Sequence, residues 1–171
     1  AIVGLTNLLI KSPLNEQQEK YLTVIKKSGA NLLVIINDIL DLAKIESGKM
    51  ELEAVPFPLI AAIHNINTIL GLKAEEKGIK MEQIIAEGVP EYVIGDETRI
   101  TQVIMNLAGN AIKFTEKGAV TISVIPENIT DKEVVIRIGI RDTGIGIPAD
   151  KIDKIFESFG QASSDTTRKF G

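Results

Sequence analysis

The sequence predicts an α+β protein, in which a helical hairpin precedes a domain of mixed strands with helices on one face. Three observations predict this class. A long helix with a repeating apolar seam lies in the first third, strand-like alternating segments follow it, and two amphipathic helices lie among those strands. With 171 residues, the chain is long enough for one core, or for one domain with a helical appendage.

The hairpin is predicted from the spacing of apolar residues near the start of the chain. Residues 2–12 have the pattern of the end of an apolar helix, which Pro13 stops. A long helix over residues 15–47 then carries apolar residues alternately three and four positions apart, the spacing of coiled coils and helix bundles. Gly29 lies on this seam and would leave a notch or allow a close approach. The seam consists of Leu22, Ile25, Gly29, Leu32, Ile36, Ile39 and Ala43.

Further apolar residues widen this seam beyond that of a two-stranded zipper. They are Leu33, Val34, Ile35 and Leu40. A four-helix bundle built from two hairpins fits the wider seam, so we expect a homodimer formed through the hairpin. The pattern alone leaves open a single hairpin that packs on its own domain.

The apolar period changes after Gly48 from that of a helix to that of a strand. Met50, Leu52 and Ala54 alternate with polar residues and predict a short strand. The further expected elements are helices at 59–77 and 97–115, strands at 79–86, 91–96, 119–125 and 133–142, a loop at 128–132 and two helical turns at 149–159.

The composition excludes several classes of protein. There are 19 basic and 23 acidic residues and no basic block, so nucleic acid is not an expected partner. The absence of cysteine excludes disulfides and thiolate metal sites. No apolar run approaches the roughly 20 residues of a membrane span. Because the chain begins without Met, inside a helical pattern, we expect a fragment of a longer protein. The absence of cysteine suits a reducing compartment, so we expect the fragment to be cytoplasmic, with any membrane attachment through parts of the parent that are not present.

Polar residues interrupt the apolar pattern of the expected helix at 97–115. Asn106, Asn110 and Lys113 are at positions i, i+4 and i+7 and share one side of a helix. Asparagine is a mediocre helix former, so two of them one turn apart need a reason. Their amide oxygens are suitable ligands for Mg²⁺, which bridges to phosphates, and Lys113 would bind a phosphate oxygen. This helix alone does not exclude a solvated polar face.

The segment "DTGIGIP", residues 142–148, follows the last expected strand. It lacks the third glycine of a dinucleotide fingerprint and the lysine of a P-loop. The Asp142 carboxylate could instead accept a hydrogen bond from an exocyclic amine, which adenine carries and guanine presents differently. Gly144 and Gly146 would let the backbone turn close to a flat ring. Taken alone, the segment favours a simpler interpretation, a strand-ending turn in which Asp142 bonds its own backbone.

Together these stretches resemble sensor histidine kinases, the transmitter half of two-component systems. "NLAGNAIKF" resembles their N box, "DTGIGIP" their G1 box and "FESFGQ" their F box, and residues 21–53 look like the second dimerisation helix with its exit. The resemblance covers essentially the whole chain in matching order, and hybrid-type kinases and plant ethylene receptors are the most similar in character. It implies a partial dimerisation hairpin at 1–48 and, at 49–171, a partial ATP-binding domain with the Bergerat-type α/β sandwich fold.

The resemblance implies that the asparagine-bearing helix holds the phosphate side of ATP. Asn110 would bind Mg²⁺, Asn106 would support the metal and the phosphates, and Lys113 would meet phosphate oxygens. The related ATPases gyrase, Hsp90 and MutL carry a glutamate as the base for water where this chain has Asn106, and an amide cannot take a proton from water. Hydrolysis is therefore disfavoured, and transfer of the γ-phosphoryl group to a histidine is favoured, a reaction that depends mainly on positioning and charge neutralisation.

The resemblance also implies how the base and the lid would be formed. Asp142 would bond the adenine amine. Gly144 and Gly146 would shape the base pocket with Ile147 against the ring, and Phe156 and Phe159 would anchor the start of the ATP lid.

The implied activity requires a phosphate-accepting histidine, which the family carries on the first helix of the hairpin. By the resemblance this residue lies upstream of Ala1, so we expect no catalytic residue within the chain. The only histidine, His64, lies on an amphipathic helix with no acid after it, and we interpret it as structural. The family's G2 box and final strands are likewise expected beyond Gly171. We therefore expect that this polypeptide alone does not autophosphorylate.

Two functions follow from this resemblance. The first is the core of a sensor histidine kinase, which binds Mg-ATP and, in the complete parent, passes the phosphoryl group to a histidine and on to an aspartate of a response-regulator receiver domain. The alternative is a kinase-like nucleotide-binding or scaffold module without catalytic activity. An H-E-x-R-T-P-like run upstream would favour the first.

Overall fold

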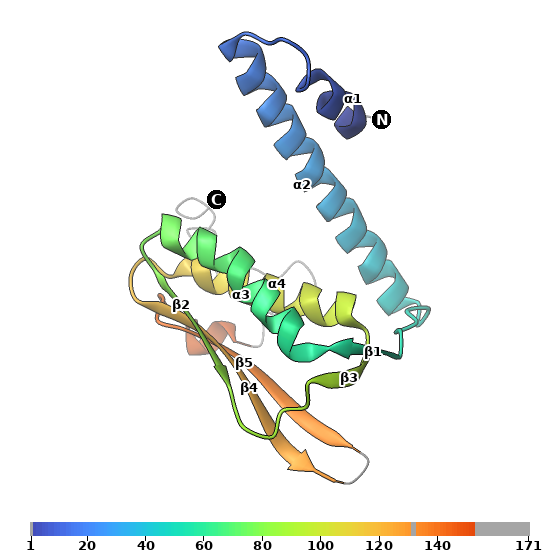
Figure 1. Ribbon diagram of the computed structural model, residues 1–171, viewed down its shortest axis with the longest axis vertical. Coiled ribbons are helices and arrows are strands. Elements are labelled where there is room, and N and C mark those ends of the chain that lie inside the picture. Colours follow the sequence, from blue (N-terminus) through green and yellow to red (C-terminus); the bar gives the residue numbers. More distant parts are fainter. Residues whose placement is uncertain (1, 131–132, 153–171) are drawn as a thin grey trace. The chain divides into compact units, whose positions relative to one another are not determined.

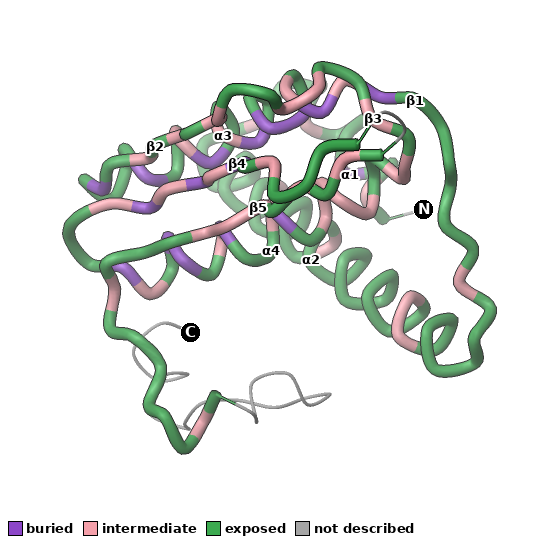
Figure 2. Tube along the Cα trace, turned by 90° about the horizontal axis from the view of Figure 1, so that it is seen from below, coloured by how far each residue is buried: buried purple, intermediate pink, exposed green. Residues whose placement is uncertain are grey.

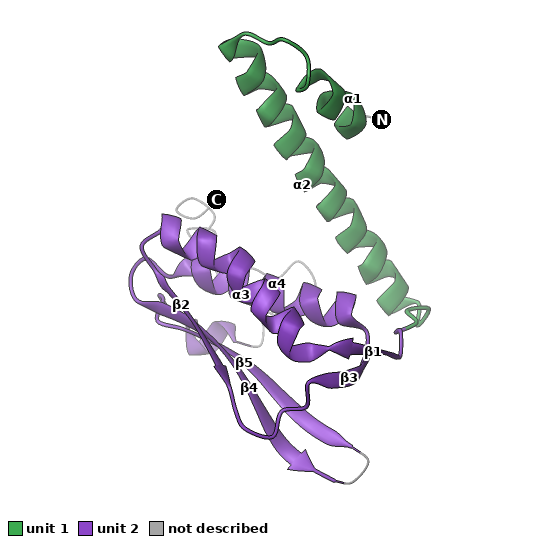
Figure 3. Cartoon of the chain, viewed as in Figure 1, with its two compact units in different colours: residues 1–51 green, residues 52–171 purple. Residues whose placement is uncertain are grey.

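The structure, a computed structural model, describes residues 2–130 and 133–152. The chain divides into two compact units, residues 1–51 and residues 52–171 (Figure 3). Within the described ranges, no helix is long and apolar enough to cross a membrane. In chain order (Figure 1) the elements are α1 (Ile2–Leu9), α2 (Glu16–Glu46), β1 (Val55–Pro58), α3 (Leu59–Glu76), β2 (Lys80–Ile85), β3 (Tyr92–Gly95), α4 (Glu97–Phe114), β4 (Ala119–Ile129), β5 (Val134–Asp142) and the 3₁₀ turn η1 (Ala149–Lys151).

In the first unit, α1 and α2 form the expected helical hairpin. Asn15 begins α2 with a capping box: its side chain accepts the Gln18 N–H at 2.8 Å, and the Gln18 side chain accepts the Asn15 N–H at 3.0 Å. On the seam, a Cβ at Gly29 would lie 2.9 Å from Cγ2 of Val3 on α1. The glycine therefore permits the close helix approach that its position on the seam predicted.

The apolar seam of α2 is open to solvent in a single copy of the chain. None of the 31 residues of α2 is buried, and Figure 2 colours the helix almost entirely as exposed. Seam residues such as Leu32 and Ile39 keep 56% and 54% of their surface exposed. Apolar surface of this extent, arranged in one stripe on a helix, is typical of a protein–protein interface.

In the second unit, β2, β4 and β5 form a three-stranded mixed sheet. Strand β2 runs parallel to β4, and β5 runs antiparallel to it, as the expected mixed sheet requires. Alternate residues of β4, namely Val120, Ile122 and Val124, are buried. Because Ile140 lies opposite Ile122 and Ile138 opposite Val124, the apolar residues of β5 belong to the same face.

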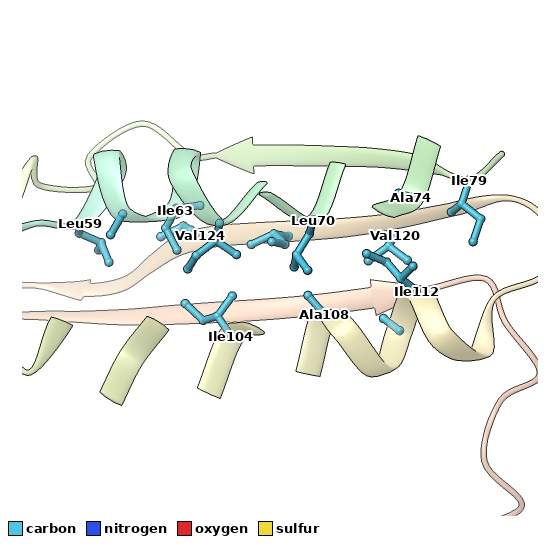
Figure 4. Packing of buried hydrophobic residues seen from close by; sticks show 14 of the residues in the cluster. Leu59, Ile63, Leu70, Ala74, Ile79, Ile104, Ala108, Ile112, Val120 and Val124 are labelled. Carbon is cyan, nitrogen blue, oxygen red and sulfur yellow. The ribbon is translucent and has the colours of Figure 1, made fainter. Parts of the chain in front are cut away.

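The core of this unit lies between that face and the helices α3 and α4. Figure 4 shows labelled side chains from both helices gathered with those of β4. Each helix contributes residues three or four positions apart, so one stripe of each is buried, as the amphipathic patterns predicted. Full burial of each large aliphatic side chain stabilises the fold by roughly 1.5–3 kcal/mol. The helical core residues include Ile63, Ile66, Leu70, Ile104, Ala108 and Ile112.

The expected strand at residues 50–54 is wrong. The strand begins at Val55, and β1 pairs antiparallel with β3 in a two-stranded sheet, with Val55 opposite Gly95 and Pro58 opposite Tyr92. Proline has no N–H to donate, but a strand of a two-stranded sheet can present that side to solvent. The alternation of apolar and polar residues at 50–54 was therefore not sufficient to predict a strand, because a strand also needs a neighbouring strand with which it can form hydrogen bonds.

Two further expected boundaries differ from the structure. Strand β4 continues past residue 125 to Ile129, and its register shifts between Pro126 and Asn128. A β-bulge of this kind tolerates a proline, so the strand can continue past Pro126. Residues 128 and 129, which were expected to belong to the loop at 128–132, are therefore part of β4. Of the helical turns expected at 149–159, the structure describes only the single 3₁₀ turn η1, and residues 153–159 lie outside the described residues.

Asp96 begins α4 as its N-cap. The Arg99 N–H donates to Oδ1 of Asp96 at 3.0 Å, and the Glu53 N–H donates to Oδ2 at 3.3 Å. The bond from the Arg99 backbone is the main cause that lowers the pKa of the Asp96 carboxyl, and the bond from Glu53 adds to it. The charged form of Asp96 is therefore favoured in the folded protein.

We expect Asp96→Asn to make stability less sensitive to acid. Because the folded pKa of Asp96 is lowered, its contribution is complete above the unfolded pKa of about 3.9 and is lost as the pH falls through the folded pKa. Asparagine caps helices about as well but does not titrate. Thermal unfolding between pH 6 and pH 2.5 should show a steeper loss for wild type than for Asp96→Asn. A Glu87→Gln control, at an exposed turn residue, should follow wild type; parallel curves for all three would contradict the prediction.

Candidate functional site

The structure brings the end of α4 against the loop that follows β5. The Ile145 N–H donates to the carbonyl oxygen of Phe114 at 3.4 Å. A Cβ at Gly144 would lie 2.5 Å from this same oxygen and 2.9 Å from Oδ1 of Asp142, so a side chain at this position has no room. The two stretches that the sequence singled out thus meet at the last turn of α4.

Asp142 lies at the end of the sheet face that the helices cover. Its Cα is opposite that of the buried Val120, on the same register as the apolar residues of β5. Its Oδ1 accepts the Gly144 N–H at 2.8 Å, which is the strand-ending turn of the simpler interpretation. An ionised carboxylate has about four lone-pair sites. The exposed Asp142 therefore retains acceptor capacity for a ligand while it shapes the loop.

Thr143 joins this loop to the turn before β4. Its Oγ1 accepts the Ala119 N–H at 3.0 Å and donates to the Lys117 carbonyl at 3.3 Å. The Thr143 N–H donates to the Ala119 carbonyl at 3.2 Å. This role of Thr143 was not predicted, because its only local signal in the sequence is a β-branched hydroxyl residue between Asp142 and Gly144.

The helix α4 carries the polar residues that the sequence predicted for the site. Asn106, Asn110 and Lys113 are exposed, whereas Ile104 and Ala108 on the other side of the helix are buried. The Nζ of Lys113 lies 5.5 Å from the centroid of the Phe114 ring, a cation–π distance. Two amide groups and an ammonium group are therefore exposed on the helix whose last turn contacts the loop.

The remaining loop residues leave apolar surface beside Asp142. Gly146 has φ +69°, the left-handed region that favours glycine. Ile147 and Ile145 are 51% and 57% exposed, which suits them to cover a flat ring. The expected lid residues Phe156 and Phe159 lie outside the described residues.

For a cation, the helix α4 offers the exposed amide groups of Asn106 and Asn110. The described part of the chain contains no group of three or more His, Cys, Asp or Glu residues that could hold a metal. The amide oxygens of Asn106 and Asn110 are hard ligands of the kind that Mg²⁺ accepts, and Mg²⁺ commonly completes its shell with water and substrate phosphates. The site therefore fits a magnesium–phosphate pair better than a metal alone.

His64 lies on α3 and has a side-chain partner on β2. Its Nδ1 is 3.0 Å from Oε1 of Gln83, which joins α3 to β2. This contact agrees with the structural role expected for the histidine.

Two protein-family models match the chain. The His Kinase A (phospho-acceptor) domain matches residues 1–48, and the model described as Histidine kinase-, DNA gyrase B-, and HSP90-like ATPase matches residues 95–171. The two matches agree with the expected fold class, a helical hairpin followed by an α/β ATP-binding domain.

Curated relatives agree with these matches. The chain is 42% identical over 170 residues to the signal transduction histidine-protein kinase BarA of Escherichia coli K12, and 39% identical over 170 residues to the sensor protein GacS of Pseudomonas syringae. It is also 40% identical over 176 residues to the hybrid signal transduction histidine kinase A of Dictyostelium discoideum. Each match covers 99% of this chain but only 18%, 19% and 8% of the respective relative, so the chain spans less than a fifth of their length.

Solved structures of histidine kinases are also similar to this chain. Full-length ShkA in complex with AMPPNP matches with a TM-score of 0.77 and 32% identity, over 94% of this chain and 34% of that one. Histidine kinase ThkA in complex with the response regulator TrrA matches with a TM-score of 0.58 and 26% identity, over 94% and 46%. A helical hairpin followed by an α/β domain of this ATPase class defines a two-component signalling protein. The chain belongs to the sensor histidine kinase family.

Proposed function

We propose that the chain binds Mg-ATP where α4 meets the loop after β5, and that the protein containing it transfers the γ-phosphoryl group to a histidine. The observation that carries this proposal is the close approach of Gly144 to the Phe114 carbonyl, because it brings the loop that carries Asp142 to the last turn of the helix that bears Asn106 and Asn110. The match to ShkA, whose structure contains AMPPNP, supports a nucleotide as the ligand.

The phosphates and magnesium would be held by α4. Asn110 and Asn106 would supply amide oxygens on neighbouring turns, with Asn110 as the direct ligand. Lys113 would donate to phosphate oxygens, where a charge-assisted bond is about twice as strong as a neutral one. Magnesium, when bound, would neutralise charge on the phosphate oxygens.

The base would be held by the loop. Asp142 would accept a hydrogen bond from the exocyclic amine of adenine with the lone pairs that the Gly144 N–H leaves open. Gly144 and Gly146 would let the backbone approach the ring, and Ile147 would cover it.

The residue at position 106 favours phosphoryl transfer over hydrolysis. Asn106 is an amide, which cannot take a proton from an attacking water. Without such a base, positioning of the γ-phosphoryl group against a histidine remains the chemistry that this site supports.

We assign residues 1–48 to the dimerisation hairpin and residues 49–171 to the ATP-binding domain. The open apolar seam of α2 would be buried against a second copy of the chain in a four-helix bundle, as the phospho-acceptor domain match supports. The complex of ThkA with TrrA supports a response-regulator receiver as the onward acceptor. This chemistry places the domain in the cytoplasm, where ATP is available.

Titration with Mg-ADP and Mg-ATP tests the proposal. We expect Asp142→Asn to weaken binding by about 10- to 100-fold, the range for loss of a hydrogen bond to a charged group. Asn110→Ala should remove the dependence on magnesium. Asn37→Ala, at an exposed position of α2, makes the same change in the other unit and should bind as wild type.

The outcomes separate the candidate functions. A folded chain that binds no nucleotide would contradict the proposed site. Binding by the full-length protein without phosphate on histidine, after incubation with labelled ATP, would favour the scaffold alternative over the kinase.

A further inference from the structure

The last turn of α4 receives a hydrogen-bond donor from outside the helix. Lys77 follows α3, and its Nζ donates to the carbonyl oxygens of Ile112 and Lys113 at 2.7 Å each and to that of Thr115 at 3.0 Å. An ammonium has three N–H donors and no acceptor, so these bonds use its full donor capacity. The carboxyl end of a helix also favours a positive charge. Lys77 is therefore a side-chain cap for α4.

The backbone holds Lys77 in this place. Its N–H donates to the Ala74 carbonyl at 3.1 Å, and the N–H of the buried Ile79 donates to the same carbonyl at 2.9 Å. The Lys80 N–H then donates to the Gly118 carbonyl at 2.9 Å, which ties the start of β2 to the turn after α4. Backbone hydrogen bonds at the end of α3 and the start of β2 therefore hold the segment that carries the Lys77 ammonium group.

The loop after β5, which contains Gly144 and Gly146, also forms a hydrogen bond with a carbonyl of the last turn of α4. The last carbonyls of a helix have no partner within it. Lys77 binds those of Ile112 and Lys113, and the Ile145 N–H binds that of Phe114. One helical turn is therefore bonded both by Lys77 and by the loop that carries Asp142.

We propose that Lys77 is a positioning residue of the nucleotide site. By holding the last turn of α4, it fixes the Phe114 carbonyl against which Gly144 and Ile145 rest, and so sets where Asp142 lies relative to Asn110. The inference rests on the proposed function, since it assumes that this site binds the nucleotide. Lys77 itself touches neither base nor phosphate in this account.

The test compares Lys77→Met with Lys73→Met in the full chain. Methionine keeps most of the length of the lysine side chain without the ammonium group. Lys73 is exposed on the last turn of α3, the helix that Lys77 follows. We expect Lys77→Met to raise the Kd for Mg-ADP by about tenfold. Hydrogen exchange of the Ile145 amide without nucleotide should also become about tenfold faster. Lys73→Met should leave both unchanged.

If Lys77 only stabilised the fold, Lys77→Met would lower the unfolding temperature and leave the Kd for Mg-ADP and the Ile145 exchange unchanged. Ile63→Val removes one methyl group from the core, so it lowers stability and should leave the Kd and the Ile145 exchange as in wild type. If Lys77→Met does not fold, Lys77→Gln, which keeps a neutral donor, is measured in the same way. A wild-type Kd in the Lys77 variant would overturn the inference. If wild type itself binds no nucleotide, the proposed function fails, and unchanged Ile145 exchange would then overturn the positioning role as well.

Discussion

Gly144→Ala is expected to weaken nucleotide binding by about 10- to 100-fold, comparable with the loss of a hydrogen bond to a charged group. An added Cβ would lie 2.5 Å from the Phe114 carbonyl oxygen and 2.9 Å from Oδ1 of Asp142. Lys77 bonds the carbonyls on both sides of Phe114, so we expect the loop to move and carry Asp142 with it. Such overpacking also costs about 1–3 kcal/mol of stability.

Isothermal titration with Mg-ADP and thermal unfolding measure the two effects of Gly144→Ala. Gly71→Ala is the matched control, because Gly71 lies inside α3 with nothing within 4 Å of an added Cβ. Alanine is the better helix former, so this variant should gain about 0.5–1 kcal/mol and bind as wild type. Equal affinity in Gly144→Ala and wild type would show that the close approach to Phe114 does not position the site.

Ile63→Ala is expected to lower the free energy of unfolding of the α/β unit by about 2–5 kcal/mol. Ile63 lies on α3 with 0% of its surface exposed, among the side chains of α4 and β4 (Figure 4). Removal of its outer carbons loses their transfer free energy and leaves a cavity that packed neighbours fill only in part. A loss of this size is a large part of the stability of a typical domain.

Ile69→Ala provides the comparison within the same helix. Ile69 is 51% exposed, so the same chemical change removes less buried surface and leaves no closed cavity. Denaturant unfolding should place Ile69→Ala much closer to wild type than Ile63→Ala. Similar losses at the two positions would mean that the exposed side of α3 is buried in solution.

The helices were the part of the fold that could be predicted best from the sequence. Their signals are local: Asn15 and Asp96 each cap a helix, and α1 ends at Leu9, shortly before Pro13. Apolar residues at helical spacing then specify the buried stripe within one element. The helices α1 to α4 begin and end within a few residues of their expected bounds because these interactions join residues close in sequence.

The strands were predicted less well, because a strand is completed by a partner that lies far along the chain. Residues 50–54 alternate but find no partner edge, whereas Val55–Pro58 pairs with β3 despite its two prolines. In the same way β4 passes through Pro126 because a bulge and the β5 partner accommodate it.

The side-chain groups of the proposed site can be read from the sequence alone: the amides of Asn106 and Asn110 on one side of a helix, and Asp142 before a glycine loop. The contact between the last turn of that helix and the loop is visible only in the folded protein, because it is made by backbone atoms. The Phe114 carbonyl, the space at Gly144 and the three carbonyls bound by Lys77 have no signature in side-chain identity. Every residue carries the same backbone groups, so their pairing depends on where the folded chain places them and not on which residues bear them.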